Sequence, residues 1–123
     1  AKAYTKFAEI TADLGKMKGF IKSLGRTIPA NNTEDWLKSE VLTILDENPT
    51  NFLAVVNHPE YEHRIFIQEA TEAGAIKKMS NKRYVLDNGI ELGDLGSTIA
   101  YINNDDNQEV KMRIKTQIEL KKR

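Results

Sequence analysis

A helical pattern that ends at a glycine and is followed at once by a short basic hairpin limits the folds open to this chain more than any other feature. Apolar residues at helical spacing lead into Gly74, which is well placed as a left-handed helix C-cap. Two short strands, residues 75–79 and 83–86, follow it and are joined by an asparagine-containing turn. Helices followed by a β-hairpin are the outline of a winged helix. The sequence therefore predicts a mostly helical α+β fold that is winged-helix-like.

Three helices are predicted before this hairpin. The first covers about residues 33–46, with Asn32 or Thr33 as its N-cap. Asn48 and Pro49 start a short second helix, because proline is favoured at the first helical position. The third is the helix that ends at the glycine described above. Together with the hairpin, these helices make up the predicted winged-helix-like arrangement.

Further elements are predicted after the hairpin. A second turn signal occupies residues 87–89, and Ile90 and Leu92 are placed to extend the sheet by a third short strand. A helix capped by Ser97 follows, and a last, highly charged helix starts at about Asp106. We expect this C-terminal helix to be a solvated tail.

An amphipathic helix is predicted near the N-terminus. Its apolar residues alternate in spacings of three and four, which is a strict a/d heptad seam. We call these residues the N-terminal stripe: Phe7, Ile10, Leu14, Met17, Ile21, Leu24 and Ile28. Pro29 and two asparagines then break the pattern, so we predict a docking or oligomerisation helix with its linker at residues 1–31 and the winged-helix-like domain with its tail at 32–123. The stripe either packs on the protein's own core or binds another chain, because periodicity does not identify the partner surface.

Composition sets outer limits on the protein class. The 123 residues leave room for one ordinary domain with an appendage, and 40% of them are apolar, which is enough for a core. No cysteine is present, which excludes disulfides and thiolate chemistry and fits a reducing compartment or a particle assembled inside a host cell. The longest apolar run is four residues, 53–56, so no membrane-spanning helix is predicted.

Charge is unevenly distributed although the formal net charge is zero. Residues 1–31 and residues 109–123 each hold six basic and two acidic residues, so each end carries a charge of +4. Residues 32–108 hold six basic and fourteen acidic residues, which gives −8. This asymmetry permits head-to-tail contacts between copies, or basic arms on an acidic body, and it weakens a nucleic-acid role for the middle of the chain.

The hairpin supplies the best nucleic-acid signal in the sequence. Its basic residues and one aromatic neighbour are the types that contact phosphates, and they are Lys77, Lys78, Lys82, Arg83 and Tyr84. The helix before the hairpin opposes this interpretation, because it carries several glutamates and a groove-reading helix normally carries basic or amide side chains. The lysines can equally serve as a solvated hairpin edge that discourages strand pairing.

No catalytic, cofactor or metal motif is recognisable. His58 and His63 lie five positions apart, whereas two histidines on one helix face need a spacing of four, and Pro59 sets His58 outside the helix. Asp105 and Asp106 lack the ligand alternation of a calcium loop, and the glycines after the hairpin are not followed by a lysine of a phosphate loop. We therefore assign no catalytic residue, no metal and no cofactor, and expect a protein that is not an enzyme.

Six segments spread over roughly residues 36–119 carry a resemblance to a known group of proteins. They are FLAVVNHPEY, EATEAGAIKK, RYVLDNG, LG, AYINNDDNQE and RIKTQIE. Their order and residue classes resemble a small domain that recurs in uncharacterised proteins of tailed bacteriophages. The chain has Ile102-Asn103-Asn104 where that pattern usually shows leucine and a proline-containing turn. The resemblance implies a phage origin and an interaction role, and it assigns no functional residues.

These observations favour a non-enzymatic phage structural or assembly protein, in the virion or associated with the head. Its expected partners are further copies of itself or other phage structural proteins, with weak non-specific nucleic-acid contact and no membrane. A winged-helix DNA-binding regulator is one alternative, and a small phage inhibitor of a host protein is another. The expected location is the virion or the host cytoplasm.

Overall fold

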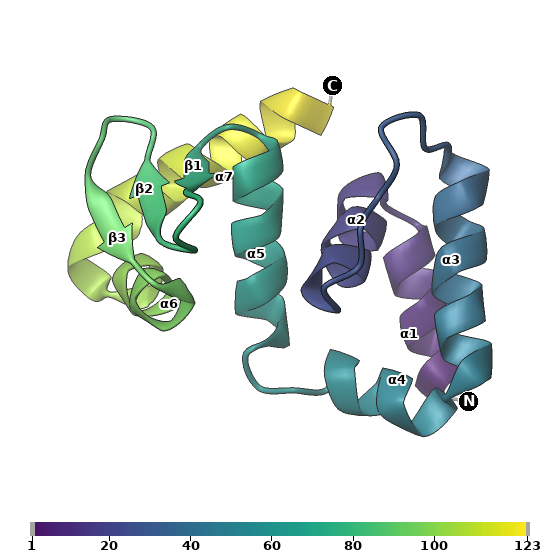
Figure 1. The fold of residues 1–123 in the computed structure, drawn as a ribbon. Coiled ribbons are helices and arrows are strands. Elements are labelled where there is room, and N and C mark those ends of the chain that lie inside the picture. The colour runs from purple at the N-terminus through teal and green to yellow at the C-terminus, as the bar shows by residue number, and fades with distance from the viewer. Residues whose placement is uncertain (1, 123) are drawn as a thin grey trace. The chain divides into compact units, whose positions relative to one another are not determined.

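The structure, a computed structural model, describes residues 2–122 and is mostly helical with one small antiparallel sheet (Figure 1). The elements in chain order are α1 (Lys2–Thr11), α2 (Leu14–Ser23), α3 (Glu34–Glu47), α4 (Pro49–Val56), α5 (Tyr61–Glu72), β1 (Ile76–Lys78), β2 (Tyr84–Leu86), β3 (Glu91–Gly93), α6 (Leu95–Asn103), the 3-10 helix η1 (Asp105–Asn107) and α7 (Gln108–Lys122). The prediction of a mostly helical α+β fold is confirmed. Within the described residues, no helix combines the length and the apolar character that crossing a bilayer requires.

The chain forms two compact units, Ala1–Ile65 (unit 1) and Phe66–Arg123 (unit 2), and each has its own hydrophobic core. The division falls inside α5. The boundary that the sequence suggested, between residues 31 and 32, lies within unit 1. The physical reason is that α1 and α2 do not stand apart from the helices after the linker: both pack against α3.

The N-terminal region contains two helices where the sequence predicted one. α1 ends at Thr11, whose hydroxyl donates to the Phe7 carbonyl oxygen at 2.8 Å. Asp13 then adopts an extended backbone and accepts the Lys16 backbone N–H at 3.1 Å, which makes it the N-cap of α2. Because apolar spacing continues across this break, the heptad pattern alone did not reveal it. α2 ends at Ser23, so the last two residues of the N-terminal stripe lie beyond it.

The core of unit 1 is built from one face of each of its helices. Its buried apolar residues are Ala3, Ile10, Met17, Phe20, Ile21, Leu37, Val41, Ile44, Leu45, Phe52, Val56, Tyr61 and Ile65. At its centre the Phe20 ring meets the rings of Phe52 and Tyr61, with centroid distances of 5.2 Å and 6.4 Å. Two predicted helix starts are confirmed here: Thr33 caps α3, and Asn48 caps α4 with proline at the first helical turn.

The end of α5 is fixed by Gly74. Its φ is +79°, its N–H donates to the Thr71 carbonyl oxygen, and the next N–H, of Ala75, donates to the Ala70 carbonyl oxygen. These paired hydrogen bonds form a Schellman motif, which requires a left-handed residue. The predicted left-handed cap is confirmed, and β1 begins two residues after it.

The sheet of unit 2 is a meander of three short antiparallel strands in the order β1-β2-β3. In the first pair Ile76 faces Leu86 and Lys78 faces Tyr84. β1 and β3 are the edges, and α6 and α7 belong to the same unit (Figure 1). The core of unit 2 consists of Ile67, Ala70, Ala75, Ile76, Tyr84, Leu86, Leu92, Ile99, Ile102, Ile114 and Ile118.

Gly93 joins β3 to α6 in very little space. Its φ is +92°, and a Cβ added there would lie 3.1 Å from the Ser97 Cβ. Glycine is thus required at this position twice, once by the backbone conformation and once by close packing. The N-cap of α6 is Asp94, whose carboxylate accepts the Ser97 N–H at 2.8 Å; the sequence had assigned this role to Ser97 itself.

Candidate functional site

The basic hairpin formed by β1 and β2 closes through a tight turn at Met79–Lys82. The Lys82 N–H donates to the Met79 carbonyl oxygen at 2.9 Å, and the Asn81 Oδ1 accepts the Arg83 N–H at 3.1 Å. Lys82 has a φ of 64° and is the one non-glycine residue with positive φ in the described part of the chain. A lysine in this conformation is strained relative to glycine. The turn therefore holds a charged side chain at a position that favours glycine.

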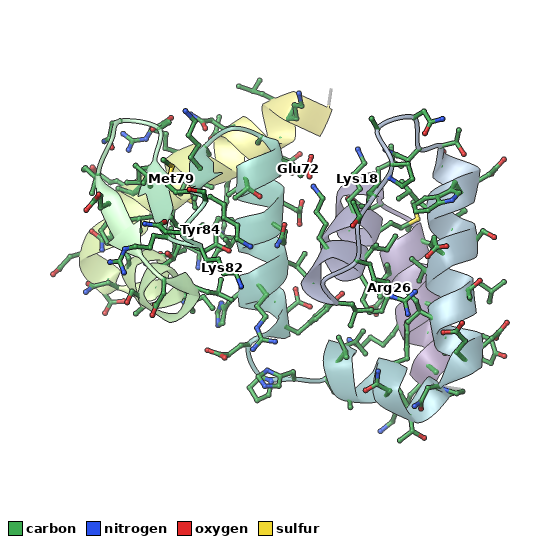
Figure 2. All side chains as sticks on the ribbon, viewed as in Figure 1. Lys18, Arg26, Glu72, Met79, Lys82 and Tyr84 are labelled. Carbon is green, nitrogen blue, oxygen red and sulfur yellow. The ribbon has the colours of Figure 1, made fainter. Side chains whose placement is uncertain are left out.

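Three of the five predicted nucleic-acid residues are exposed lysines. Lys77 and Lys78 lie on the edge strand β1, and Lys82 lies in the turn. Met79, 46% exposed, begins that turn, and its side chain, with those of Lys82 and Tyr84, can be followed in Figure 2. The hairpin thus presents three cations and one apolar side chain.

The other two predicted nucleic-acid residues have different environments. Tyr84 is only 4% exposed, and the Lys78 ammonium lies 6.0 Å from its ring centroid. Burial also raises the pKa of the Tyr84 hydroxyl. The ring is a core side chain and is not free to stack on a base, as strand alternation with buried Leu86 shows.

Arg83 lies beside the start of α6. A Cβ added at Gly93 would be 3.5 Å from the Arg83 Nη2. The pKa of the Asp94 carboxyl is lowered, first by the hydrogen bonds from Ser97 and further by the Arg83 charge. Arg83 therefore serves a carboxylate of its own unit, and its charge is partly offset there.

The N-terminal stripe is largely used inside unit 1. Ile10, Met17 and Ile21 are buried at 4%, 1% and 0% exposure, and three further members of the stripe pack partly buried against the same core. Leu14 differs, because it is 48% exposed. Of the two interpretations of the stripe, packing on the protein's own core accounts for most of its residues.

Two helices carry exposed apolar residues that the cores do not use. On α7, Ile114 and Ile118 are buried, whereas Met112 and Leu120 are each 60% exposed. Met112, Thr116 and Leu120 follow one another at intervals of four and define the outer face of α7. The sequence showed these apolar residues but not which of them the core would bury.

The second exposed face is on α3. Leu42 is 41% exposed and lies on the helix side opposite the core residues Val41, Ile44 and Leu45. Asp35 and Asp46 are exposed on the same side, at intervals of seven and four from Leu42. These three residues define the outer face of α3, which is acidic around one apolar side chain.

A cavity of about 190 Å³ opens in unit 1. It lies among the end of α2, the end of α4 and the first turn of α5 and is lined by Ser23, Leu24, Ala54, Val55, His58, Tyr61 and Arg64. Three separate segments supply these residues, so no local motif marks them. We call it the Arg64 cavity.

His58, one of the two histidines weighed as metal ligands, has a structural contact. Its Nδ1 accepts the Glu60 backbone N–H at 3.1 Å, so it caps the turn before α5. Among residues 2–122, no group of three or more histidine, aspartate or glutamate side chains is placed to hold a metal ion.

Comparison of the chain with models of protein families, with curated proteins and with solved structures found no match. Functional inference therefore rests on the surfaces described above and on the resemblance of the sequence to phage domains.

Proposed function

We propose that this chain is a non-enzymatic structural protein of a tailed-bacteriophage particle, in the virion or associated with the head, and that it acts by protein-protein contacts. The phage setting rests on the sequence resemblance. The outer face of α7 carries the interaction role, because that helix exposes large apolar side chains on the side that its own core does not use. An exposed apolar face rimmed by charges is typical of surfaces that bind other proteins.

The burial energy of this face is sufficient to matter. Covering an exposed methionine or leucine contributes about 1–2 kcal/mol each, given that part of each side chain is already buried. Arg113 and Lys115 are exposed on the flanks of the face, and the surrounding segment, residues 109–123, carries a charge of +4. A complementary partner surface is therefore apolar at its centre and acidic at its rim.

The outer face of α3 has that character. It places Leu42 between two exposed aspartates, within a segment of the chain whose charge is −8. In this proposal the outer face of α7 on one copy binds the outer face of α3 on the next. Such a contact is heterologous and head-to-tail, so it builds rings or filaments rather than closed two-fold dimers.

Sedimentation of two complementary variants tests this assembly. Met112→Lys with Leu120→Glu removes one face, and Leu42→Lys with Asp46→Lys removes the other. Wild-type protein is expected to form large species that dissociate as salt rises, while each variant alone is monomeric. Mixing the two variants should restore dimers but nothing larger, because each retains one intact face.

An exposed apolar residue outside both faces provides the control. Ile90→Lys, at a site that is 48% exposed, should assemble as the wild type does. Wild-type protein that stays monomeric at high concentration, or a variant mixture that stays monomeric, would contradict this mode of assembly.

One observation favours a second function, duplex binding by the basic hairpin: the strained left-handed Lys82 at its turn. That proposal treats α3, α4 and α5 with β1 and β2 as a winged helix. The acidic residues of α5, among them Glu62, oppose it, so we expect weak binding with equal affinity for random and selected duplexes. A nanomolar, sequence-selective site that is lost in Lys82→Glu would instead support the regulator.

A further inference from the structure

The Arg64 cavity contains an unused hydrogen-bond donor. The Arg64 Nε is buried and has no hydrogen-bond partner within the described chain. A buried N–H without an acceptor is costly, and native proteins rarely retain one unless a ligand or water completes it. The Arg64 side chain as a whole is 39% exposed, so a ligand can reach the guanidinium from solvent.

The neighbouring carboxylate does not complete this donor. Glu60 Oε1 lies 3.6 Å from the Arg64 Nη2, which is ion-pair distance but too long for a hydrogen bond. Nε and Nη2 form one edge of the guanidinium, the edge that binds both oxygens of a carboxylate side by side. Glu60 thus approaches the edge without occupying it.

Other residues of the cavity add polar groups near this edge. His58 uses its Nδ1 to accept the Glu60 N–H, which leaves its Nε2 for another partner. Burial, and then the charge of Glu62, raise the pKa of the Tyr61 hydroxyl, so this group stays protonated as a donor at neutral pH. The Ser23 hydroxyl donates to the Phe20 carbonyl oxygen at 2.7 Å, so its oxygen is left as an acceptor.

The remaining walls are apolar and the volume is small. Leu24, Ala54 and Val55 supply aliphatic surface. The volume of about 190 Å³ exceeds the roughly 30 Å³ that one water molecule occupies, and it lies below the roughly 300–1,000 Å³ of pockets for drug-sized ligands. Only a molecule of a few heavy atoms fits.

We propose that the Arg64 cavity binds a small aliphatic carboxylate, with both oxygens on the Nε and Nη2 edge of Arg64 and the hydrocarbon chain against Leu24, Ala54 and Val55. The planar anion matches the unfilled guanidinium edge, and the aliphatic chain matches the apolar walls. This site is independent of the assembly surfaces on α3 and α7, so either proposal can fail without the other.

Titration of the full chain with butanoate, followed by NMR of the arginine Nε–H and the backbone amides, tests the site. We expect a dissociation constant on the order of 1 mM, with the largest shifts at Arg64 and its cavity neighbours. Butanamide has the same shape without the charge and should bind at least tenfold more weakly. Inorganic phosphate should also bind more weakly, because it leaves the apolar walls uncovered.

Three variants locate the binding. Arg64→Lys keeps the positive charge but lacks the two-nitrogen edge, so it should lose at least tenfold in affinity. Glu60→Gln removes the competing carboxylate and should bind butanoate severalfold more tightly. Arg26→Lys is the matched control, because Arg26 pairs with Glu40 and Glu47 at 3.9 Å and does not line the cavity. It should bind as the wild type does.

Several results would overturn the proposal. They are an unchanged affinity in Arg64→Lys, shifts that map outside the cavity, or butanamide binding as tightly as butanoate. If Arg64→Lys proves unstable, the Glu60→Gln result decides: unchanged or weaker binding there contradicts the assigned guanidinium edge.

Discussion

The rings of Phe20 and Phe52 lie 5.2 Å apart between centroids and are inclined by 56°. This contact joins α2 to α4 and places the second half of the N-terminal segment inside the core of unit 1. Tilted aromatic pairs contribute about 0.5–1.5 kcal/mol beyond their burial. The N-terminal helices are therefore part of the fold and contribute to its stability.

The first prediction compares two residues of the N-terminal stripe. Ile21→Asp should unfold unit 1, because it places a charge at a site with 0% exposure. Leu14→Asp should change the free energy of unfolding by less than about 0.5 kcal/mol, because Leu14 is 48% exposed. Urea denaturation followed by circular dichroism measures both. Equal losses in the two variants would mean that the stripe forms one continuous buried seam.

The second prediction concerns Gly74. Gly74→Val should lower the free energy of unfolding by about 1–3 kcal/mol, because a β-branched residue is forced to positive φ. A Cβ at this position would meet nothing within 4 Å, so the cost is conformational and not steric. Thermal melts measure it. Gly89→Asn is the control, since asparagine tolerates the same conformation in an exposed turn. A Gly74→Val melt like that of the parent would contradict the end of α5 at this residue.

The third prediction separates stability from charge at Lys82. Lys82→Gly should raise the free energy of unfolding by up to about 1 kcal/mol, because it relieves the left-handed strain. It should also weaken any duplex binding by the hairpin, because it removes a cation. Lys82→Ala is the matched comparison, since it loses the charge and keeps the strain. Lys82→Gly that is less stable than the parent would refute the assigned strain.

The fourth prediction concerns pH. The folded-state pKa of Asp94 is lowered from its ordinary value of 3.8, so the carboxylate stabilises the fold above that value. This contribution should decline as pH falls from 3.8 through the lowered pKa. Asp94→Asn keeps a capping side chain without the ionisation. The stability difference between the two proteins, measured by denaturation between about pH 2 and pH 6, should therefore shrink in acid. A difference that is constant over this range would contradict the shift.

The predicted features that the structure confirms are set by neighbouring residues. Thr33, Asn48 and Gly74 act on backbone groups within one helical turn, so the local sequence is sufficient to identify them. The same applies to the hairpin, whose turn is closed by hydrogen bonds within five residues.

The features that sequence reasoning missed depend on distant parts of the chain. The break at Asp13 was hidden because apolar spacing continues through it. The Arg64 cavity needs α2, α4 and α5 together, so its lining has no sequence signature. Tyr84 is the exception: its alternation with Leu86 was a readable signal of burial, and its basic neighbours drew attention from it.

Gly93 ties strand pairing to helix docking. It faces Tyr84 across the β2-β3 ladder, and its Cα side lies against Ser97 in the first turn of α6. No spare backbone separates the two elements, so the third strand cannot pair fully while α6 is out of place. Pairing and docking are therefore one cooperative event. The amides of β3 and those of the first turns of α6 should exchange with solvent deuterium through the same opening, at a common free energy.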